Sequence, residues 1–214
     1  PAVYRVHDEP DLEKLTDLAL FTKELGIVLN LDTPKNITKS LNDLALKAQS
    51  DDNLKMLQPM IIRSMAKAIY TTENIGHYGL AFDHYTHFTS PIRRYSDVLV
   101  HRLLAKNLQK ITRESLEELE SKCKHVSAQE RKANDAERDS IKYKQVEYMK
   151  DKVGEEFEGF ISGFIDRGIF VELKESRAEG LITYEQLDEA YISTGSSLKV
   201  TGKQSGKTLS MGDT

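Results

Sequence analysis

Apolar residues recur at helical spacing through much of the first 150 positions of the chain. Asp11 can cap a first helix that Gly26 ends, and the apolar residues between them favour one face: Leu15, Leu18, Leu20, Phe21 and Leu25. Further helices are predicted over 36–49 and over 52–70, the second from Leu54, Leu57, Ile61, Met65 and Ile69. This pattern predicts a helix-rich first region.

Residues 71–90 fit no period, and they include four aromatic residues and three of the six histidines. We expect an extended, buried loop or a pair of strands there. Ser90-Pro91 then predicts a helix start, because serine caps helices and proline at the first helical position wastes no hydrogen bond. An apolar stripe follows: Ile92, Tyr95, Leu99, Leu103 and Leu104. Residues 113–151 predict a hairpin arm and a long helix, whose part over 130–150 is polar enough to face solvent or a partner.

From Gly154 the pattern changes to short strands, with apolar runs at 157–161, 168–173 and 178–182. Residues 193–214 predict a long loop. The pattern therefore predicts a mostly helical first part of 150 residues and a second part with strands from Gly154.

Composition narrows the classes of protein. The chain has 214 residues, of which 30% are charged and 39% hydrophobic. Its single cysteine, Cys123, excludes an internal disulfide and a multi-cysteine metal site, which suits a reducing compartment. No run of 18 apolar residues occurs, so we expect a cytoplasmic protein with no membrane partner. Because Pro1 leads straight into a strand-like segment, we also expect that the chain begins inside a larger protein.

The net charge of −4 conceals an uneven distribution. Residues 85–150 hold 14 basic and 10 acidic side chains, between two acidic flanking regions. A basic middle of this kind can form a local phosphate site despite the overall acidity.

The stretch 87–104, HFTSPIRRYSDVLVHRLL, carries the candidate chemistry. A helix start that presents Arg93 and Arg94 offers backbone N–H groups and two guanidinium forks to phosphate oxygens. Asp97 lies four residues after Arg93 and is expected to hold it, with His101 on the same face. The ordinary alternative is a capped helix with solvated arginines. Because many functional groups surround this helix start, we favour a site that positions a phosphate group.

The longer stretch IGHYGLAFDHYTHFTSPIRRYSDVLVHRLL closely resembles the C-terminal part of the catalytic domain of the RNB family, which comprises ribonuclease II and ribonuclease R. The ribonuclease R branch is the most similar. Residues 154–182 resemble the S-one-type OB-fold RNA-binding module that follows this domain. The resemblance implies an α+β fold: the helix-rich C-terminal half of an RNB catalytic domain over 1–152, then an S-one-type OB-fold β-barrel over 153–214. An OB barrel takes five strands and only three are predicted, so we expect a truncated barrel with open edges.

The family hydrolyses single-stranded RNA from the 3′ end to nucleoside monophosphates, with Mg²⁺. The resemblance implies that Arg93 is catalytic and stabilises charge at the scissile phosphate. It also implies a set of RNA-binding residues: Ser90, Arg94, Tyr95, Arg102, Glu137, Phe164 and Phe170. For Glu137, an ordinary exposed glutamate is an equal alternative. For the module, at least one of Phe160, Phe164 and Phe170 is expected in the core. Arg167 and Thr183 replace the usual phenylalanine and histidine, so weak binding is expected.

The Mg²⁺-binding aspartates of the family lie in an Asp-rich segment upstream of the part that this chain resembles. Here Asp51-Asp52 is an isolated pair suited to capping a helix, and His84 with His87 lacks further zinc ligands. We therefore expect this chain to bind no metal and to be inactive alone, although its full-length parent uses Mg²⁺. The expected partner is single-stranded RNA. The parent is expected to be a monomer, and the fragment could associate through edge strands.

Two other classes of function remain open from the residues alone. One is a non-catalytic OB-fold RNA-binding protein, such as a translation factor. The other is a helical interaction protein with no nucleic-acid role. The motif over 87–104 favours the exoribonuclease, because an RNA-binding module by itself needs no such helix.

Overall fold

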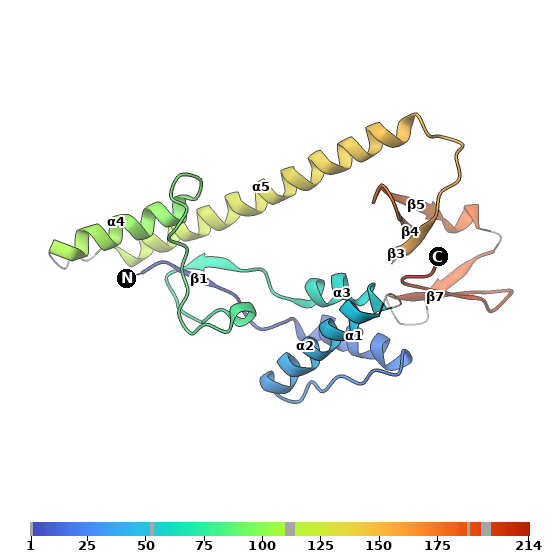
Figure 1. Ribbon diagram of the computed structural model, residues 1–214, viewed down its shortest axis with the longest axis horizontal. Helices are drawn as coiled ribbons and strands as arrows, with labels where there is room; N and C mark the ends of the chain where they lie inside the picture. The colour runs from blue at the N-terminus through green and yellow to red at the C-terminus, as the bar shows by residue number, and fades with distance from the viewer. Residues whose placement is uncertain (1, 52–53, 110–113, 188, 194–197) are drawn as a thin grey trace. The chain divides into compact units, whose positions relative to one another are not determined.

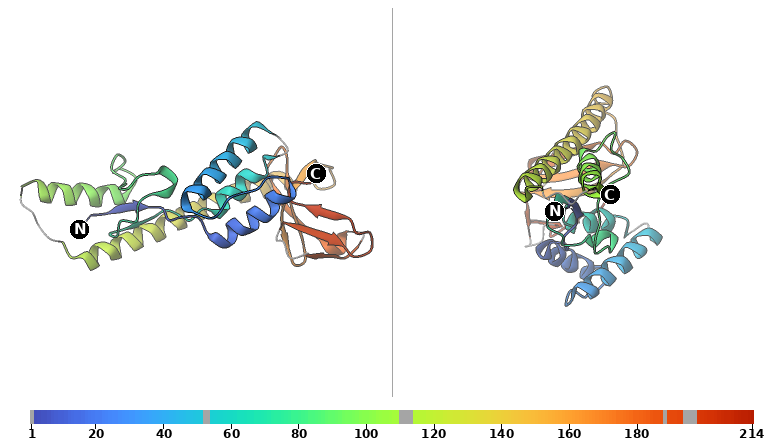
Figure 2. Two further views of the ribbon diagram at one scale, coloured as in Figure 1. Left: turned by 90° about the horizontal axis from the view of Figure 1, so that it is seen from below. Right: turned by 90° about the vertical axis from the view of Figure 1, so that its left-hand side faces the viewer.

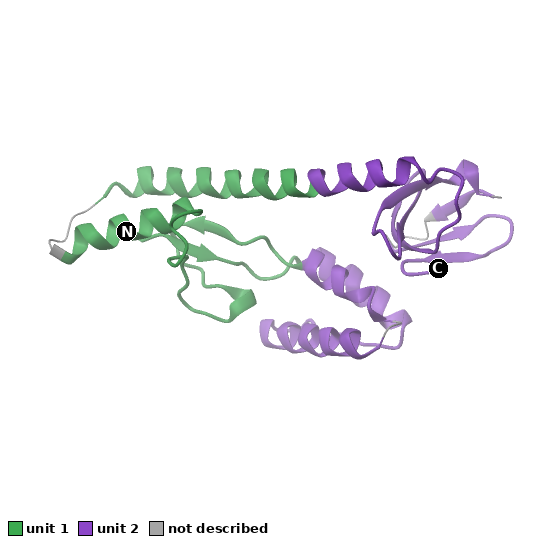
Figure 3. Ribbon diagram, turned by 45° about the horizontal axis from the view of Figure 1, so that its top comes forward, with its two compact units in different colours: residues 1–11, 65–138 green, residues 12–64, 139–214 purple. Residues whose placement is uncertain are grey.

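The computed structural model describes residues 2–51, 54–109, 114–187, 189–193 and 198–214. Within these residues it contains five α-helices and three small antiparallel sheets, so the α+β class is confirmed (Figure 1). Two compact units divide the chain, residues 1–11 with 65–138 and residues 12–64 with 139–214 (Figure 3). None of the described helices is long and apolar enough to cross a membrane.

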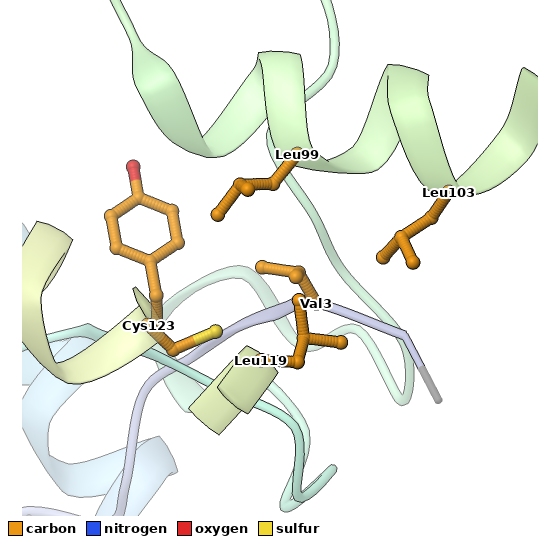
Figure 4. Packing of buried hydrophobic residues seen from close by; sticks show 6 residues of the cluster. Val3, Leu99, Leu103, Leu119 and Cys123 are labelled. Atoms are coloured by element: carbon orange, nitrogen blue, oxygen red, sulfur yellow. The ribbon is translucent and has the colours of Figure 1, made fainter. Parts of the chain in front are cut away.

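The first unit is built around a two-stranded sheet and two helices. Strand β1 (Tyr4–Val6) pairs antiparallel with β2 (Ile69–Thr71), which places Arg5 opposite Tyr70. Helix α4 (Tyr95–Gln109) and the first part of α5 (Leu116–Lys150) pack with this sheet. Figure 4 shows Leu99 and Leu103 of α4 pointing toward Val3 and Leu119. The full core cluster is Val3, Tyr70, Leu99, Leu103, Leu119 and Cys123.

The apolar stripe predicted for α4 is confirmed only in part. Leu99 and Leu103 are buried, but Ile92 is fully exposed and precedes the helix. Tyr95 and Leu104 are about half exposed. The stripe is narrower than the sequence predicted because the chain enters the helix only at Tyr95.

Helix α5 replaces the hairpin arm and helix predicted over 113–151. It is one continuous helix, although residue 113 itself lies outside the described residues. Only its first third contributes buried side chains: Leu119, Cys123 and Ser127. The prediction that residues 130–150 are mostly solvent-facing is confirmed. Burial raises the pKa of the Cys123 thiol to about 11, with a smaller contribution from Glu120, so this cysteine is an inert core residue.

The segment 71–90 is irregular, as expected, but it is not buried. It holds the short 3₁₀ helix η2 (Tyr78–Leu80), and most of its residues are exposed or half-buried. Its rings contact one another and also rings outside the segment. His77 lies 5.2 Å from His7 and 5.1 Å from Tyr85, measured between ring centroids.

Three helices of the second unit form a small cluster of their own: α1 (Leu12–Glu24), α2 (Pro34–Ser50) and α3 (Leu57–Ser64) (Figure 2). Gly26 ends the first helix with a positive φ of 77°, as predicted. The hydroxyl oxygen of Thr33 caps α2 by accepting from the Asn36 N–H. Helix α3 contacts both other helices, and the cluster buries a common apolar core: Leu15, Leu18, Phe21, Ile37, Leu41, Leu44, Ala48, Leu57, Met60 and Ile61.

The helix predicted over 52–70 is too long. Residues 52–53 lie outside the described residues, and α3 ends at Ser64. Ile69 lies in β2 opposite Val6 instead. Pairing with β1 satisfies the backbone of Ile69–Thr71, and this tertiary contact overrides the helical spacing of the apolar residues.

Among the described residues, six strands in two sheets follow α5. The first sheet has the order β3-β4-β5, from β3 (Gly159–Ile165), β4 (Gly168–Leu173) and β5 (Glu179–Thr183). The second has the order β6-β7-β8, from β6 (Tyr191–Ser193), β7 (Lys199–Gly202) and β8 (Thr208–Ser210). The tail also pairs with β3, because Ile161 N–H donates to Asp213 O (2.8 Å) and Gly212 N–H donates to Ile161 O (2.9 Å). The described residues form no closed barrel.

The prediction of a long loop over 193–214 is therefore wrong. The prediction that the module ends after three strands is also wrong. Residues 194–197 lie outside the described residues. The turn between β7 and β8 is held by the Glu189 carboxylate, which accepts from the Gln204 and Ser205 N–H groups at 2.8 Å and 3.0 Å. The Gly- and Ser-rich composition hid these strands, because a carboxylate outside the hairpin fixes its turn.

Candidate phosphate-binding site

The two neighbouring arginines lie in a turn ahead of α4, not in the first turn of a helix. Both the Arg93 and Arg94 N–H groups donate to Ser90 O, at 3.3 Å and 3.0 Å. Helix α4 begins only at Tyr95. The predicted helix start at Ser90-Pro91 is wrong because the Ser90 N–H donates to the Asp97 carboxylate, which folds the chain back before the helix begins.

Asp97 organises this turn. Its side chain is fully buried, and Oδ2 accepts from Ser90 N (2.7 Å) and from Arg94 Nη2 (3.0 Å). Oδ1 accepts from the Ser96 hydroxyl at 3.2 Å. The sequence predicted that Asp97 holds Arg93, and this is wrong: its partner is Arg94, three residues before it.

The ionised form of Asp97 is favoured despite its burial. Burial alone would raise the pKa of this carboxyl, but the hydrogen bonds from Ser90 and Arg94 outweigh it and lower the pKa. Glu120 on α5 behaves in the same way. Burial would raise its pKa, yet the Thr72 N–H and the Thr71 and Thr72 hydroxyls lower it.

We expect these two carboxylates to make the chain sensitive to acid. A carboxyl whose folded pKa is depressed adds stability above its unfolded pKa, about 4, and loses that contribution as the pH falls through the folded value. The free energy of unfolding should therefore drop as the pH is lowered below about 4. Denaturant titrations from pH 7 to pH 2.5 measure it. The Asp97→Asn variant should show a flatter dependence, and a dependence as steep as in the unchanged chain would contradict this assignment.

Arg93 differs from its neighbour in its surroundings. Its side chain is exposed, and among the described residues no carboxylate lies within ion-pair distance of it. The Arg94 side chain is only 22% exposed and is paired with Asp97, and its buried Nε has no hydrogen-bond partner in the part of the chain that the structure describes. Of the two guanidinium groups, that of Arg93 is the one available to bind an external anion.

Contacts of two aromatic residues, His87 and Phe88, hold the chain in place just before the turn. The Tyr70 hydroxyl and His87 Nδ1 share a hydrogen bond of 2.7 Å. His101 on α4 stacks on Phe88 with ring centroids 4.2 Å apart, and its Nε2 donates to Phe88 O at 2.8 Å. Burial, then the nearby Arg94 and Arg5 charges, lower the pKa of His87, which favours the neutral imidazole.

Sequence reasoning missed the support behind Tyr70. The Arg5 guanidinium lies 4.5 Å from the centre of the Tyr70 ring and makes two hydrogen bonds to Glu130, at 2.6 Å and 3.1 Å. Burial raises the pKa of Tyr70, so it remains a neutral phenol. Arg5 and Glu130 are 125 positions apart, and no local pattern signals their pairing.

The structure gathers only some of the predicted RNA-binding residues. Ser90, Arg94 and Tyr95 lie in or beside the Arg93 turn. Arg102 is exposed on α4, seven residues after Tyr95 and therefore on the same face. Glu137 is exposed on α5.

Phe164 and Phe170 do not share a surface. In the β3-β4-β5 register, Phe164 is opposite the buried Ile169, whereas Phe170 is opposite Gly163 and Leu181. Residues directly opposite share a face and neighbours along a strand alternate, so the two rings lie on opposite faces of the sheet. Phe160, Phe164 and Phe170 are all partly buried. Phe164 lies on the face of the sheet that carries the buried Ile169, so it is the one of the three that the register places toward the core.

The described residues do not fit a magnesium or zinc site. They include no group of three or more His, Cys, Asp or Glu side chains placed to hold a metal ion. The Asp51 N–H donates to Lys47 O at the end of α2, and the Asp51 carbonyl accepts from the Leu54 N–H (3.0 Å) where the next turn begins, so the predicted role at a helix start stays a prediction. Asp52 lies outside the described residues.

Comparison with known proteins places this geometry in context. A family model described as the RNB domain matches residues 1–110. Ribonuclease R of Aquifex aeolicus is 41% identical over 220 residues, which cover 100% of this chain and 31% of that protein. Ribonuclease R of Escherichia coli is 38% identical over 229 residues, covering 100% of this chain and 28% of that protein. The chain thus spans about a third of the length of these relatives.

Solved structures agree with the fold. Mycoplasma genitalium RNase R in complex with ribose-methylated single-stranded RNA superposes with a TM-score of 0.86 and 31% identity, over 99% of this chain and 34% of that one. Yeast Ssd1, described as a pseudonuclease, superposes with a TM-score of 0.69 over 94% of this chain and 25% of that one. At 21% identity, the second likeness shows a shared fold alone.

Proposed function

The chain belongs to the RNB family, and from this we propose that it is the C-terminal part of a 3′–5′ exoribonuclease that hydrolyses single-stranded RNA. In this proposal, residues 1–152 complete the catalytic domain and residues 153–214 form an RNA-binding module. Mg²⁺ ligands come from residues outside this chain, since the described residues hold no fitting group. The products are nucleoside monophosphates.

The observation that carries the proposal is the exposed Arg93, which has no carboxylate partner among the described residues and lies on a turn that its neighbours hold in place. A planar guanidinium can donate two parallel hydrogen bonds to a phosphate, and it stays charged at any working pH. Placed beside the scissile phosphate, it stabilises the negative charge that grows as the phosphodiester bond breaks. Arg94 mainly stabilises the turn, through its ion pair with Asp97.

RNA as the ligand is supported by the relatives. RNase R of Mycoplasma genitalium has been solved with single-stranded and with double-stranded RNA. On this chain we place the backbone contacts at Arg93 and Arg102, with Tyr95 between them on the exposed side of α4. A non-catalytic RNA-binding protein is not favoured, because the RNB match covers the helical region that carries the arginine turn.

RNA cleavage by the full-length protein tests this function. With Mg²⁺ and a 5′-labelled single strand, the label should move through progressively shorter products while nucleoside monophosphates accumulate. Internal cuts, or products that grow shorter from the 5′ end in a 3′-labelled strand, would contradict the proposed reaction.

RNA binding by the chain itself is expected to be weak and sensitive to salt. For single strands, log Kobs falls with log[salt] by about 0.7 per neutralised phosphate, so three contacts give a slope of about −2. Fluorescence titrations with an unstructured oligonucleotide at several salt concentrations measure it. Arg93→Ala should flatten the slope by about 0.7. Arg63→Ala, at an exposed arginine of α3, is the matched control and should leave it unchanged. A slope that does not respond to Arg93→Ala would remove Arg93 from the contact surface.

A further inference from the structure

The segment that contains Arg93 is hydrogen-bonded to two side chains of α4, which lie one helical turn apart. Asp97 and His101 are four residues apart on the helix, so their side chains leave it on the same side. Asp97 binds Ser90 and Arg94, and His101 binds Phe88. The segment is therefore held at both of its ends by one helix face.

The contacts of Asp97 close the turn around Arg93. A single carboxylate oxygen, Oδ2, accepts from the Ser90 N–H on one side of residues 91–93 and from the Arg94 guanidinium on the other. Because this carboxylate is fully buried, its partners cannot be replaced by water without cost. Its position fixes both ends of a turn whose middle carries the exposed Ile92 and Arg93.

His101 fixes the chain just before this turn. Its ring lies nearly parallel to the Phe88 ring, with an angle of 25° between the planes, and its Nε2–H donates to the Phe88 carbonyl. A stack and a hydrogen bond to the same residue define both its position and its rotation. Phe88 is only two residues before Ser90, so little backbone freedom remains between these two hydrogen-bonded residues.

We propose that Asp97 and His101 are positioning residues that hold the backbone of Arg93 in its productive place without touching the RNA. The proposal rests on the proposed role of Arg93 at the scissile phosphate. A charge-stabilising group contributes most when its place is fixed before the reaction, and a displacement of about 1 Å can cost about 100-fold in rate. An exposed arginine on a free loop would have to be ordered at each turnover, which costs conformational entropy.

A double-mutant cycle in the full-length enzyme tests this inference. Asp97→Asn keeps the shape of the side chain but removes the charge that Arg94 needs. In the enzyme with Arg93 present, it should lower kcat for single-stranded RNA by about 10-fold or more, with a much smaller change in KM. In an Arg93→Lys background, where the positioned fork is already absent, the same substitution should lower kcat by about 2-fold or less.

The controls separate positioning from general loss of stability. Glu120→Gln changes another carboxylate that accepts three hydrogen bonds in the same unit, from Thr71 and Thr72, far along the chain from the arginine turn. It should leave kcat unchanged in both backgrounds, at a temperature where every variant is folded. His101→Ala provides a second route if Asp97→Asn does not fold, because His101 is less buried, and it should show the same dependence on Arg93.

The outcomes are distinct. Equal losses of kcat in both backgrounds, or an unchanged kcat in the presence of Arg93, would overturn the positioning role of Asp97 and His101. If Arg93→Lys alone leaves cleavage at its normal rate, the proposed role of Arg93 fails instead. A loss of kcat that depends on Arg93 supports the inference.

Discussion

Replacing Arg93 by lysine in the full-length enzyme is expected to slow RNA cleavage by about 100-fold or more. Lysine keeps the positive charge but loses the planar fork that matches two phosphate oxygens at once. Single-turnover rates with excess enzyme measure the effect on the chemical step. RNA affinity should fall much less, because lysine still neutralises one phosphate.

Arg63→Lys is the matched control for this substitution. Arg63 is an exposed arginine of α3, and its replacement should leave the rate within about 2-fold. Near-normal turnover of Arg93→Lys would mean that the exposed arginine only ends a surface turn. A loss of affinity as large as the loss of rate would assign Arg93 to ground-state binding instead.

The 214-residue chain alone is expected to leave single-stranded RNA intact in the presence of Mg²⁺. Metal-assisted hydrolysis needs several carboxylates that converge on the ions and so generate the attacking hydroxide. The described residues hold no such group, and the chain spans about a third of the length of its relatives. A labelled oligonucleotide incubated with the purified chain measures this, with the full-length protein as the positive control. Stepwise shortening from the 3′ end by the chain alone would contradict the expectation.

Local patterns were sufficient for most helices. The helix predicted over 36–49 is found as α2 (Pro34–Ser50), and the buried Leu99 and Leu103 follow from their spacing. These features depend on residues that are close together in the sequence. The strands predicted at 168–173 and 178–182 match β4 and β5, because β-branched and aromatic residues are bounded there by turn residues, whereas the run at 157–161 overlaps only the start of β3.

The errors have a common physical origin in contacts between distant residues. Ile69 leaves its helical pattern because β1 offers it a strand partner. The β7–β8 hairpin forms because Glu189 binds its turn. In both cases the deciding partner lies outside the segment that carries the local pattern.

In the candidate site, too, part of the arrangement was predictable from the sequence and part was not. The motif by itself marked both arginines alike, and only the family resemblance assigned the catalytic role to Arg93. The structure distinguishes them, since Asp97 binds Arg94 and leaves Arg93 exposed. Spacing had favoured the opposite pairing, because an i, i+4 contact requires a helix and Arg93 precedes α4.

The different roles of Arg93 and Arg94 are tested most directly by observing their side chains during RNA binding. Arginine Nε–Hε signals in ¹H–¹⁵N NMR spectra of the chain can be assigned with Arg93→Lys and Arg94→Lys variants. On titration with a short single-stranded RNA, the Arg93 signal should shift saturably, and the Arg94 signal should move little because its guanidinium stays on Asp97. A saturable shift of Arg94 with Arg93 unchanged, or no shift of either, would contradict the account.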